Sequence, residues 1–321
     1  MATKSPSNTI DRVMRLTVPE YGGPEVLELV EEELRPPGEG EARIRVLAAS
    51  VSRPDVTARR GEALYSGTFL GQKTPFTPGY SVIGEVDAIG DGVSEVKPGD
   101  RVGALTVTGG YAEFLYWRTD RLIPAPATVD PARAVPLVLN YIVAYQTMHR
   151  KARVKAGDKV LIMGASGGIG TALLQRGRLA GLTLFGLASK GKHAVLDGMM
   201  RLKAMRKALS LLRRGGHMVS FGEPASRREL YRILGLTLRA NLPGSGRSLS
   251  LYGTSSYFLF NRKPYLEDWA TLFQLLVEGK INPVIAARYP ILQAADANAL
   301  LESGQVAGNV VLVSPALETF Q

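Results

Sequence analysis

The stretch from residue 159 to residue 187 constrains the fold more than any other part of the sequence. An apolar run at 159–163 enters a glycine-rich turn at 164–170, an amphipathic run at 171–175 follows, and a second apolar run ends the stretch at 182–187. This order predicts a strand, a tight turn, a helix and a second strand. Such a unit opens the parallel sheet of dinucleotide-binding folds.

Within the turn, Ala165, Gly167 and Gly170 stand in the dinucleotide spacing, with alanine in the first position. Glycines there let the backbone approach a pyrophosphate, and the helix that follows directs the positive end of its dipole at that group. The turn therefore predicts a bound nucleotide; the alternative is a tight turn that has lost its ligand. The residues expected to contact the cofactor are Ala165, Ser166, Gly167, Gly168, Ile169 and Gly170.

Length and composition indicate a globular protein of two ordinary domains. The chain has 321 residues, 45% of them hydrophobic, and no apolar stretch long enough to cross a membrane. Residues 1–9 lack the apolar core of a signal peptide, which makes the cytoplasm the expected location. The sequence contains no cysteine, which excludes disulfides and thiolate chemistry.

The net charge of +10 is concentrated in one region. Between 199 and 247 there are eleven Lys and Arg residues against two Glu. Such a cluster could attract polyanions. Apolar residues recur at helical spacing in 199–214, however, so most of these charges are expected on the solvated face of a helix. No nucleic-acid-binding motif accompanies them.

Two kinds of structure are expected along the chain. From 13 to 122, short alternating apolar runs broken by Gly and Pro predict a small, partly open β-barrel. Residues 131–150 predict a helix. The fold class is therefore α/β plus β, with a doubly wound nucleotide-binding domain beside the barrel. The later elements expected are helices near 199–214, 229–238 and 265–279, strands at 217–222 and 248–253, and final strands at 286–290 and 308–313 that return to the first domain.

Several motifs together resemble the zinc-free quinone oxidoreductase branch of the medium-chain dehydrogenase/reductase superfamily. They are Tyr-Gly-Gly-Pro-Glu-Val-Leu at 21–27, Pro-Gly-Tyr-Ser-Val-Ile-Gly-Glu-Val at 78–86, Val-Lys-Pro-Gly-Asp-Arg-Val at 96–102, Gly-Tyr-Ala-Glu-Phe at 110–114, the glycine turn, Leu-Arg-Arg-Gly-Gly at 212–216 and Val-Ser-Phe-Gly at 219–222. The resemblance covers nearly the whole chain.

This resemblance implies a GroES-like catalytic domain, a Rossmann-type nucleotide domain and a cleft between them. There NADPH would deliver hydride to an enone or a quinone, an apolar small molecule with a conjugated carbonyl. The domain boundaries expected are 1–133 with 285–321 for the catalytic domain, and 134–284 for the nucleotide domain.

A catalytic zinc ion is not expected. Zinc-dependent relatives use Cys, His and Glu ligands near these motifs, whereas this chain has Tyr80 and Ser81 where His-Glu would stand. His149, His193 and His217 are isolated and show no ligand spacing.

The end of the second strand favours NADP(H) over NAD(H). An NAD site places a carboxylate there for the ribose, but this chain has Ser189, Lys190 and Lys192. Serine and lysine can hold a 2′-phosphate, and they match the branch's Ser-x-x-Lys type of signature; the alternative is two solvated lysines at a turn. The resemblance adds Phe221, Gly222 and Asn309 to the cofactor site.

The expected catalytic groups are three tyrosines and a polar pair. Tyr65, Tyr80 and Tyr141 are candidates for orienting the carbonyl or donating the proton. Ser52 and Asp55 occupy the region where relatives carry Asn-x-x-Asp. The alternative for each tyrosine is a packing role with a hydrogen-bonded hydroxyl.

One departure from the family concerns length. Relatives place a helix, an edge strand, another helix and an inner strand before the helix that leads to residue 212, whereas this chain has only 193–200. Such a crossover needs about ten or more residues. Either the chain omits a segment of a longer parent, or 192–214 form one helix and the sheet is abbreviated; the printed sequence favours the second.

Three smaller departures weaken the cofactor site. Val143 replaces a threonine, Asn309 replaces a lysine, and Met199 and Met200 replace a glycine-rich loop. They raise a second hypothesis, a reductase descendant that performs cyclisation, addition or isomerisation. A non-enzymatic scaffold is a third. In each case the strand at 248–253 predicts a homodimer, because relatives extend their sheet there across two subunits.

Overall fold

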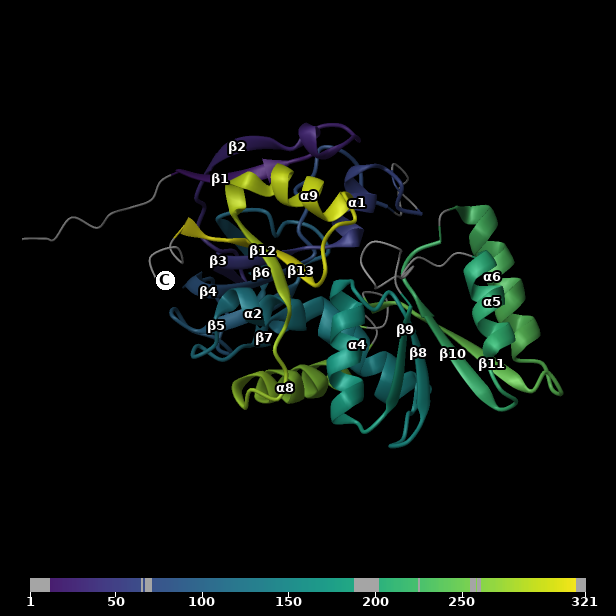
Figure 1. Ribbon diagram of the computed structural model, residues 1–321. Coiled ribbons are helices and arrows are strands. Elements are labelled where there is room, and N and C mark those ends of the chain that lie inside the picture. Colours follow the sequence, from purple (N-terminus) through teal and green to yellow (C-terminus); the bar gives the residue numbers. More distant parts are fainter. Residues whose placement is uncertain are drawn as a thin grey trace, which may run out of the picture.

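A seven-stranded sheet is built from the first and last parts of the chain (Figure 1). The computed structural model describes residues 12–64, 66, 71–187, 202–224, 226–254, 258 and 261–315. The strands run in the order β12-β13-β3-β4-β5-β7, and β6 also pairs with β3. Their bounds are β3 Glu41–Val51, β4 Ser81–Ile89, β5 Arg101–Leu105, β6 Phe114–Arg118, β7 Ile123–Pro124, β12 Ile285–Pro290 and β13 Asn309–Val313.

The C-terminal return to this sheet is confirmed, because β13 pairs antiparallel with β3 and parallel with β12. The sheet is mixed and forms no closed barrel among the described residues. A hairpin of β1 (Arg12–Thr17) and β2 (Glu28–Glu33) lies over it, with helices α1 (Arg53–Arg59) and α9 (Ala294–Glu302).

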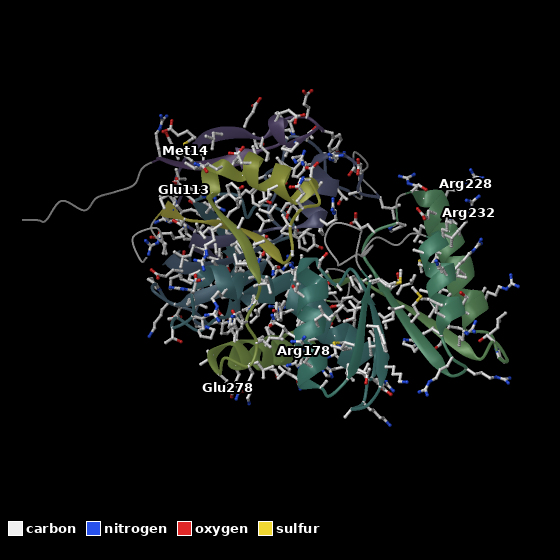
Figure 2. The ribbon with its side chains drawn as sticks, in the orientation of Figure 1. Met14, Glu113, Arg178, Arg228, Arg232 and Glu278 are labelled. Atoms are coloured by element: carbon white, nitrogen blue, oxygen red, sulfur yellow. The ribbon has the colours of Figure 1, made fainter. Side chains whose placement is uncertain are left out.

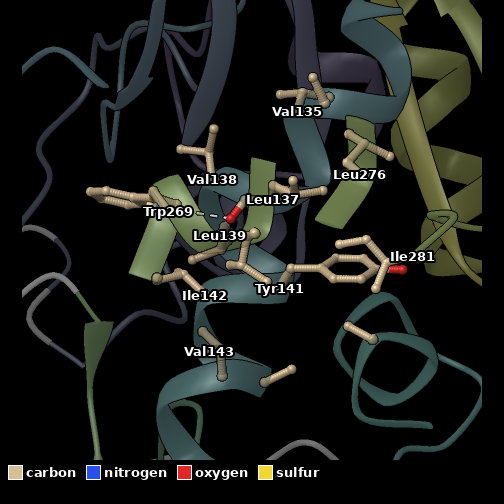
Figure 3. Close-up of a cluster of buried hydrophobic side chains, with 14 of the residues drawn as sticks. Val135, Leu137, Val138, Leu139, Tyr141, Ile142, Val143, Trp269, Leu276 and Ile281 are labelled. Atoms are coloured by element: carbon tan, nitrogen blue, oxygen red, sulfur yellow. Dashed lines mark hydrogen bonds between the residues drawn. The ribbon is translucent and has the colours of Figure 1, made fainter. Parts of the chain in front are cut away.

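The predicted helix at 131–150 is present, but several of its turns are wide. It consists of α2 (Pro131–Pro136), a π-helical stretch at Leu137–Tyr141, α3 (Ile142–Tyr145) and a second π-helical stretch at Gln146–Ala152. It forms the centre of the main core together with α8 (Lys263–Val277). Figure 3 shows Trp269 of α8 in this core, where its indole Nε1 donates to the carbonyl of Leu137 at 3.2 Å.

The predicted strand, turn, helix and strand are all present in the nucleotide region. They are β8 (Lys159–Met163), α4 (Gly168–Leu179) and β9 (Thr183–Leu187). The second half of the region contains α5 (Leu202–Leu211), β10 (Gly216–Phe221), α6 (Arg227–Ala240) and β11 (Arg247–Tyr252). No helix in the described part of the chain is long and apolar enough to span a membrane.

The sheet of this region is divided into two parallel pairs, β8-β9 and β10-β11, each with its own ladder. In the common order 3-2-1-4-5-6, these pairs correspond to strands 2-1 and 5-6. Strands 3 and 4 have no counterpart among the described residues, and 188–201 lie outside them. The described residues of this region thus form two separate pairs, and the abbreviation of the sheet at 193–200 stays a prediction.

One face of the first pair carries exposed apolar side chains. Leu161 and Phe185 face each other across the ladder and are 37% and 51% exposed, and Leu187 is 44% exposed. The second pair has a small core of its own, formed with α5 and α6 by Met205, Leu209, Ile233 and Leu249.

Candidate nucleotide-binding and active site

Two glycines give the turn after β8 its shape. Gly164 has φ +98°, a conformation that side chains rarely adopt. A Cβ on Gly170 would lie 1.5 Å from the carbonyl oxygen of Gly164, so only glycine lets α4 pack this closely against the strand. Close helix packing is the role of the third glycine in the dinucleotide fingerprint.

Gly167 leaves space for a ligand at the start of α4. It is exposed and caps the helix without a side chain, and a Cβ placed on it would meet nothing closer than 3.7 Å. The first N–H groups of a helix have no acceptor within the helix. An open glycine cap in front of these donors is suited to the pyrophosphate of a dinucleotide. Ser166, Gly168 and Ile169 are half-buried beside it, and Ala165 is buried.

The turn is attached through Gly308 to the C-terminal strand, which begins at Asn309. The N–H of Gly308 donates to the Ser166 carbonyl at 2.7 Å. Asn309 Oδ1 accepts from Asn140 Nδ2 at 2.6 Å, and its Nδ2 donates to the Val284 carbonyl at 2.9 Å. Asn309, predicted as a cofactor contact, is 3% exposed, and both of its amide atoms are engaged by Asn140 and Val284.

Asn140 is a site residue that sequence reasoning missed. A Cβ on Gly168 would lie 2.4 Å from Asn140 Nδ2 and 2.5 Å from Asn309 Oδ1, so the two amides pack directly against the turn. Nothing in the local sequence indicates this contact, because Asn140 is far from Asn309 in the chain and lies in a helix that reads as core.

Phe221 and Gly222 lie where β10 ends, and the carboxyl ends of β8 and β10 lie on the same side of the molecule (Figure 1). Ligands of open α/β sheets bind outside these ends. Gly222 is exposed with φ +110°, and Phe221 packs partly against the main core. Both residues are thus on the side of the region that a nucleotide would occupy.

Asp55 is buried and accepts hydrogen bonds from Ser52 and Gly79. The N–H and hydroxyl of Ser52 donate to its carboxylate at 2.9 and 2.5 Å, and the N–H of Gly79 donates at 3.0 Å. Burial raises the pKa of the Asp55 carboxyl to about 6. Gly79 has φ +111°, and its position places the loop that carries Tyr80. Ser52 and Asp55 therefore position this loop.

The predicted tyrosines differ in their surroundings. The Tyr80 carbonyl accepts from the N–H groups of Thr106 and Val107, and the ring packs partly against the main core. Tyr141 is fully buried and donates its hydroxyl to Gln175 Oε1 of α4 at 3.0 Å. Burial raises the pKa of Tyr141, so its hydroxyl stays protonated and serves as a link between helices. Tyr65, Ser189, Lys190 and Lys192 lie outside the described residues.

Other motif residues join the elements of the catalytic domain. Glu113 accepts from the N–H of Met14 at 2.7 Å, which attaches β1 to the sheet; both residues are labelled in Figure 2. Within the described residues, no group of three His, Asp or Glu side chains could hold a metal ion.

An open sheet domain, a dinucleotide turn and a C-terminal strand that joins them define a nucleotide-dependent dehydrogenase or reductase. Two family profiles agree with this class: "Alcohol dehydrogenase GroES-like domain" matches residues 38–127, and "Zinc-binding dehydrogenase" matches residues 182–312. The quinone oxidoreductase of Rattus norvegicus is 30% identical, over 95% of this chain and 99% of its own. The chain belongs to the zinc-free, quinone oxidoreductase-like branch of the medium-chain dehydrogenase/reductase superfamily.

Solved structures agree with this family. A mycobacterial protein complexed with NADPH is 25% identical with a TM-score of 0.75, covering 94% of this chain and 99% of that one. The Escherichia coli quinone oxidoreductase complexed with NADPH, at 23% identity and a TM-score of 0.79, has the same coverage and shares the fold. The predicted family, fold and class of NADP-dependent oxidoreductase are therefore confirmed.

The rat alignment also bears on the abbreviated sheet. It extends over 344 residues, more than the 321 of this chain, so the relative contains residues that have no counterpart here. This agrees with the short connection at 193–200.

Proposed function

We propose that the protein is an NADPH-dependent reductase that transfers hydride to a quinone or to the β-carbon of an enone. The observation that carries the proposal is the glycine turn, in which Gly167 is open and Gly170 is closely packed. NADPH would supply the hydride, and the reduced carbonyl compound would take a proton from water or a side chain. The relatives solved with NADPH support this choice of nucleotide.

The chain's own residues have distinct roles in this proposal. The backbone of residues 165–170 holds the pyrophosphate, and Ser189, Lys190 and Lys192 are proposed to hold the 2′-phosphate. Phe221 and Gly222 border the nucleotide. Asn309 acts indirectly, because its amide is engaged by Asn140 and Val284.

For the substrate, Tyr80 is the proposed orienting group in the described part of the chain, with Tyr65 as a second candidate. Ser52 and Asp55 position the loop before Tyr80. Tyr141 is proposed to support α4 through Gln175.

A fluorescence titration with NADPH, NADH and ADP-ribose tests the nucleotide. We expect NADPH to bind more tightly than NADH, and Lys192→Ala to lower the affinity for NADPH more than for NADH. Loss of a charge-assisted contact typically costs about 1.5 to 3 kcal/mol, roughly tenfold or more in affinity. Absence of binding even at millimolar nucleotide would refute the reductase assignment.

The separation of the described strands into two pairs favours a second candidate, a non-redox enzyme that retains the fold. A structure titled CurF ER cyclopropanase, 20% identical with a TM-score of 0.80, shares this fold. In this second case substrates would be converted without nucleotide. Gly167→Val would then leave turnover intact, whereas in the reductase it would block NADPH binding. The cytoplasm remains the proposed location, and a homodimer the proposed assembly.

A further inference from the structure

The outward face of α6 carries an apolar stripe. Tyr231, Leu234 and Leu238 are 72%, 46% and 69% exposed. At 3.6 residues per turn they fall within about 60° of the helix circumference. Ile233, which is fully buried, lies on roughly the opposite side. The helix thus has one apolar face packed on β10 and β11 and a second one open to solvent.

Further exposed apolar side chains stand at the C-terminal ends of α5 and α6. Leu242, just past the end of α6, is 51% exposed, and Leu211, the last residue of the neighbouring α5, is 62% exposed. Single exposed leucines are ordinary, but a group of them on one face indicates an interaction surface.

Arginines flank the stripe. Arg228, Arg232 and Arg239 fall on one flank of it by helical spacing, and all three are exposed. Figure 2 shows Arg228 and Arg232 near the start of α6, at the edge of the molecule. Within the described part of the chain, none of the three forms an ion pair. The region 202–254 contains ten Lys and Arg residues against two Glu, and one of these, Glu229, accepts from the N–H of Leu202.

We infer that this surface, formed by Tyr231, Leu234, Leu238 and the flanking Arg228, Arg232 and Arg239, binds the headgroup region of an anionic lipid membrane. A helix with leucines and an aromatic residue beside a row of arginines is the pattern of interfacial helices. The apolar side chains enter the headgroup boundary, and the arginines contact the acidic headgroups. The protein would lie on the membrane without spanning it.

Two other occupants fit the surface less well. A nucleic acid would contact the arginines but leave the leucines in water, because its backbone is recognised through charge. A second copy docked on this face of α6 would set Arg228, Arg232 and Arg239 of the two chains against each other, which like-charge repulsion opposes. A lipid surface satisfies both the charge and the apolar stripe.

Vesicle co-sedimentation of the full chain tests the inference. We expect binding to vesicles of phosphatidylcholine with phosphatidylserine, little binding to phosphatidylcholine alone, and weakening at high salt. Arg228→Gln, Arg232→Gln and Arg239→Gln together should lower the affinity on the order of a hundredfold, about fivefold per arginine. Leu234→Ser with Leu238→Ser should lower it about tenfold or more.

The matched control removes three charges from another face, with Lys155→Gln, Lys159→Gln and Arg178→Gln. These residues are exposed near β8 and α4, and this variant should bind nearly as well as the wild type. All substituted side chains are exposed, so each variant should unfold near the melting temperature of the wild type. The arginine variant and the leucine variant test the charge and the apolar stripe of the surface independently.

Several results would overturn the inference. One is the absence of co-sedimentation with vesicles that contain phosphatidylserine. Another is a loss of vesicle binding in the control variant as large as in the arginine variant. A third is vesicle binding that is unchanged by Leu234→Ser with Leu238→Ser. Tight binding to a DNA oligonucleotide that depends only on the arginines would assign the surface to nucleic acid. Conversion of a dimer to a monomer by the leucine variant would assign it to a second copy.

Discussion

At the scale of single residues, the contribution of the Asp55 carboxyl to the free energy of unfolding depends on pH. Burial raises its pKa from 3.8 to about 6, so the folded protein binds this proton more tightly than the unfolded chain does. The contribution of Asp55 to the free energy of unfolding is therefore fully present below about pH 4 and is lost as the pH rises through about 6. A shift of this size corresponds to roughly 3 kcal/mol.

Asp55→Asn should remove this dependence. Relative to the wild type, the variant should gain stability between about pH 4 and pH 7, because the amide carries no charge to bury. Urea unfolding of both proteins across this range measures the difference, in which the effects of other carboxylates cancel. If the free energy of unfolding changed with pH in the same way in both proteins, the pKa of the Asp55 carboxyl would not be raised in the folded protein.

The glycine turn allows two alanine substitutions to be compared. Gly170→Ala places a Cβ against the backbone oxygen of Gly164 and should lower the free energy of unfolding by about 1 to 3 kcal/mol or more. Gly167→Ala meets no atom closer than 3.7 Å and should change stability by less than about 1 kcal/mol. It should weaken NADPH binding all the same. Denaturant unfolding and nucleotide titration of both variants separate packing from binding; equal stability losses would contradict this account.

At the scale of elements, a buried ion pair joins helices from the two ends of the chain. Arg59 of α1 is fully buried and pairs with Glu302 of α9, which also pairs with Arg60. Glu302→Gln should lower the free energy of unfolding by about 3 to 5 kcal/mol, because it leaves the Arg59 guanidinium buried and uncompensated. Glu278→Gln, in an exposed pair with Lys280, is the control and should have little effect. Chemical denaturation of the two variants gives the comparison, and similar losses would argue against a special role for Glu302.

The spacing of apolar residues along the sequence predicted the helices and strands, because this spacing depends on which face of an element is buried. The ranges expected for β10, α6, β11 and α8 all agree with the structure within a few residues. Contacts between distant residues leave no such pattern. Arg59 with Glu302 and Asn140 with Asn309 join segments far apart in the chain, so the sequence could not reveal that Asn309 is engaged by the protein itself.

At the scale of the whole molecule, the fold followed from the order of motifs, and the short connection before α5 predicted an abbreviated sheet. The sequence did not predict that the sheet would separate into two pairs. That outcome depends on strand 4, which in relatives of this topology joins strand 1 to strand 5. In the described part of the chain, β8 and β10 have no common partner strand.

The free edge of β11 remains the predicted dimer contact. β11 pairs only with β10 in the described part of the chain, so its other edge can pair with a second copy. Two-fold antiparallel pairing would bring the middle of the strand close to its own copy. Ser250→Asp would then place two like charges near each other and should convert dimer to monomer at micromolar protein, whereas the isosteric, neutral Ser250→Asn should stay dimeric. Light scattering of the wild type and the two variants measures the oligomeric state. A monomeric wild type, or a Ser250→Asp variant that stays dimeric, would exclude β11 as the contact, because a charge at this position does not affect a dimer formed through another surface.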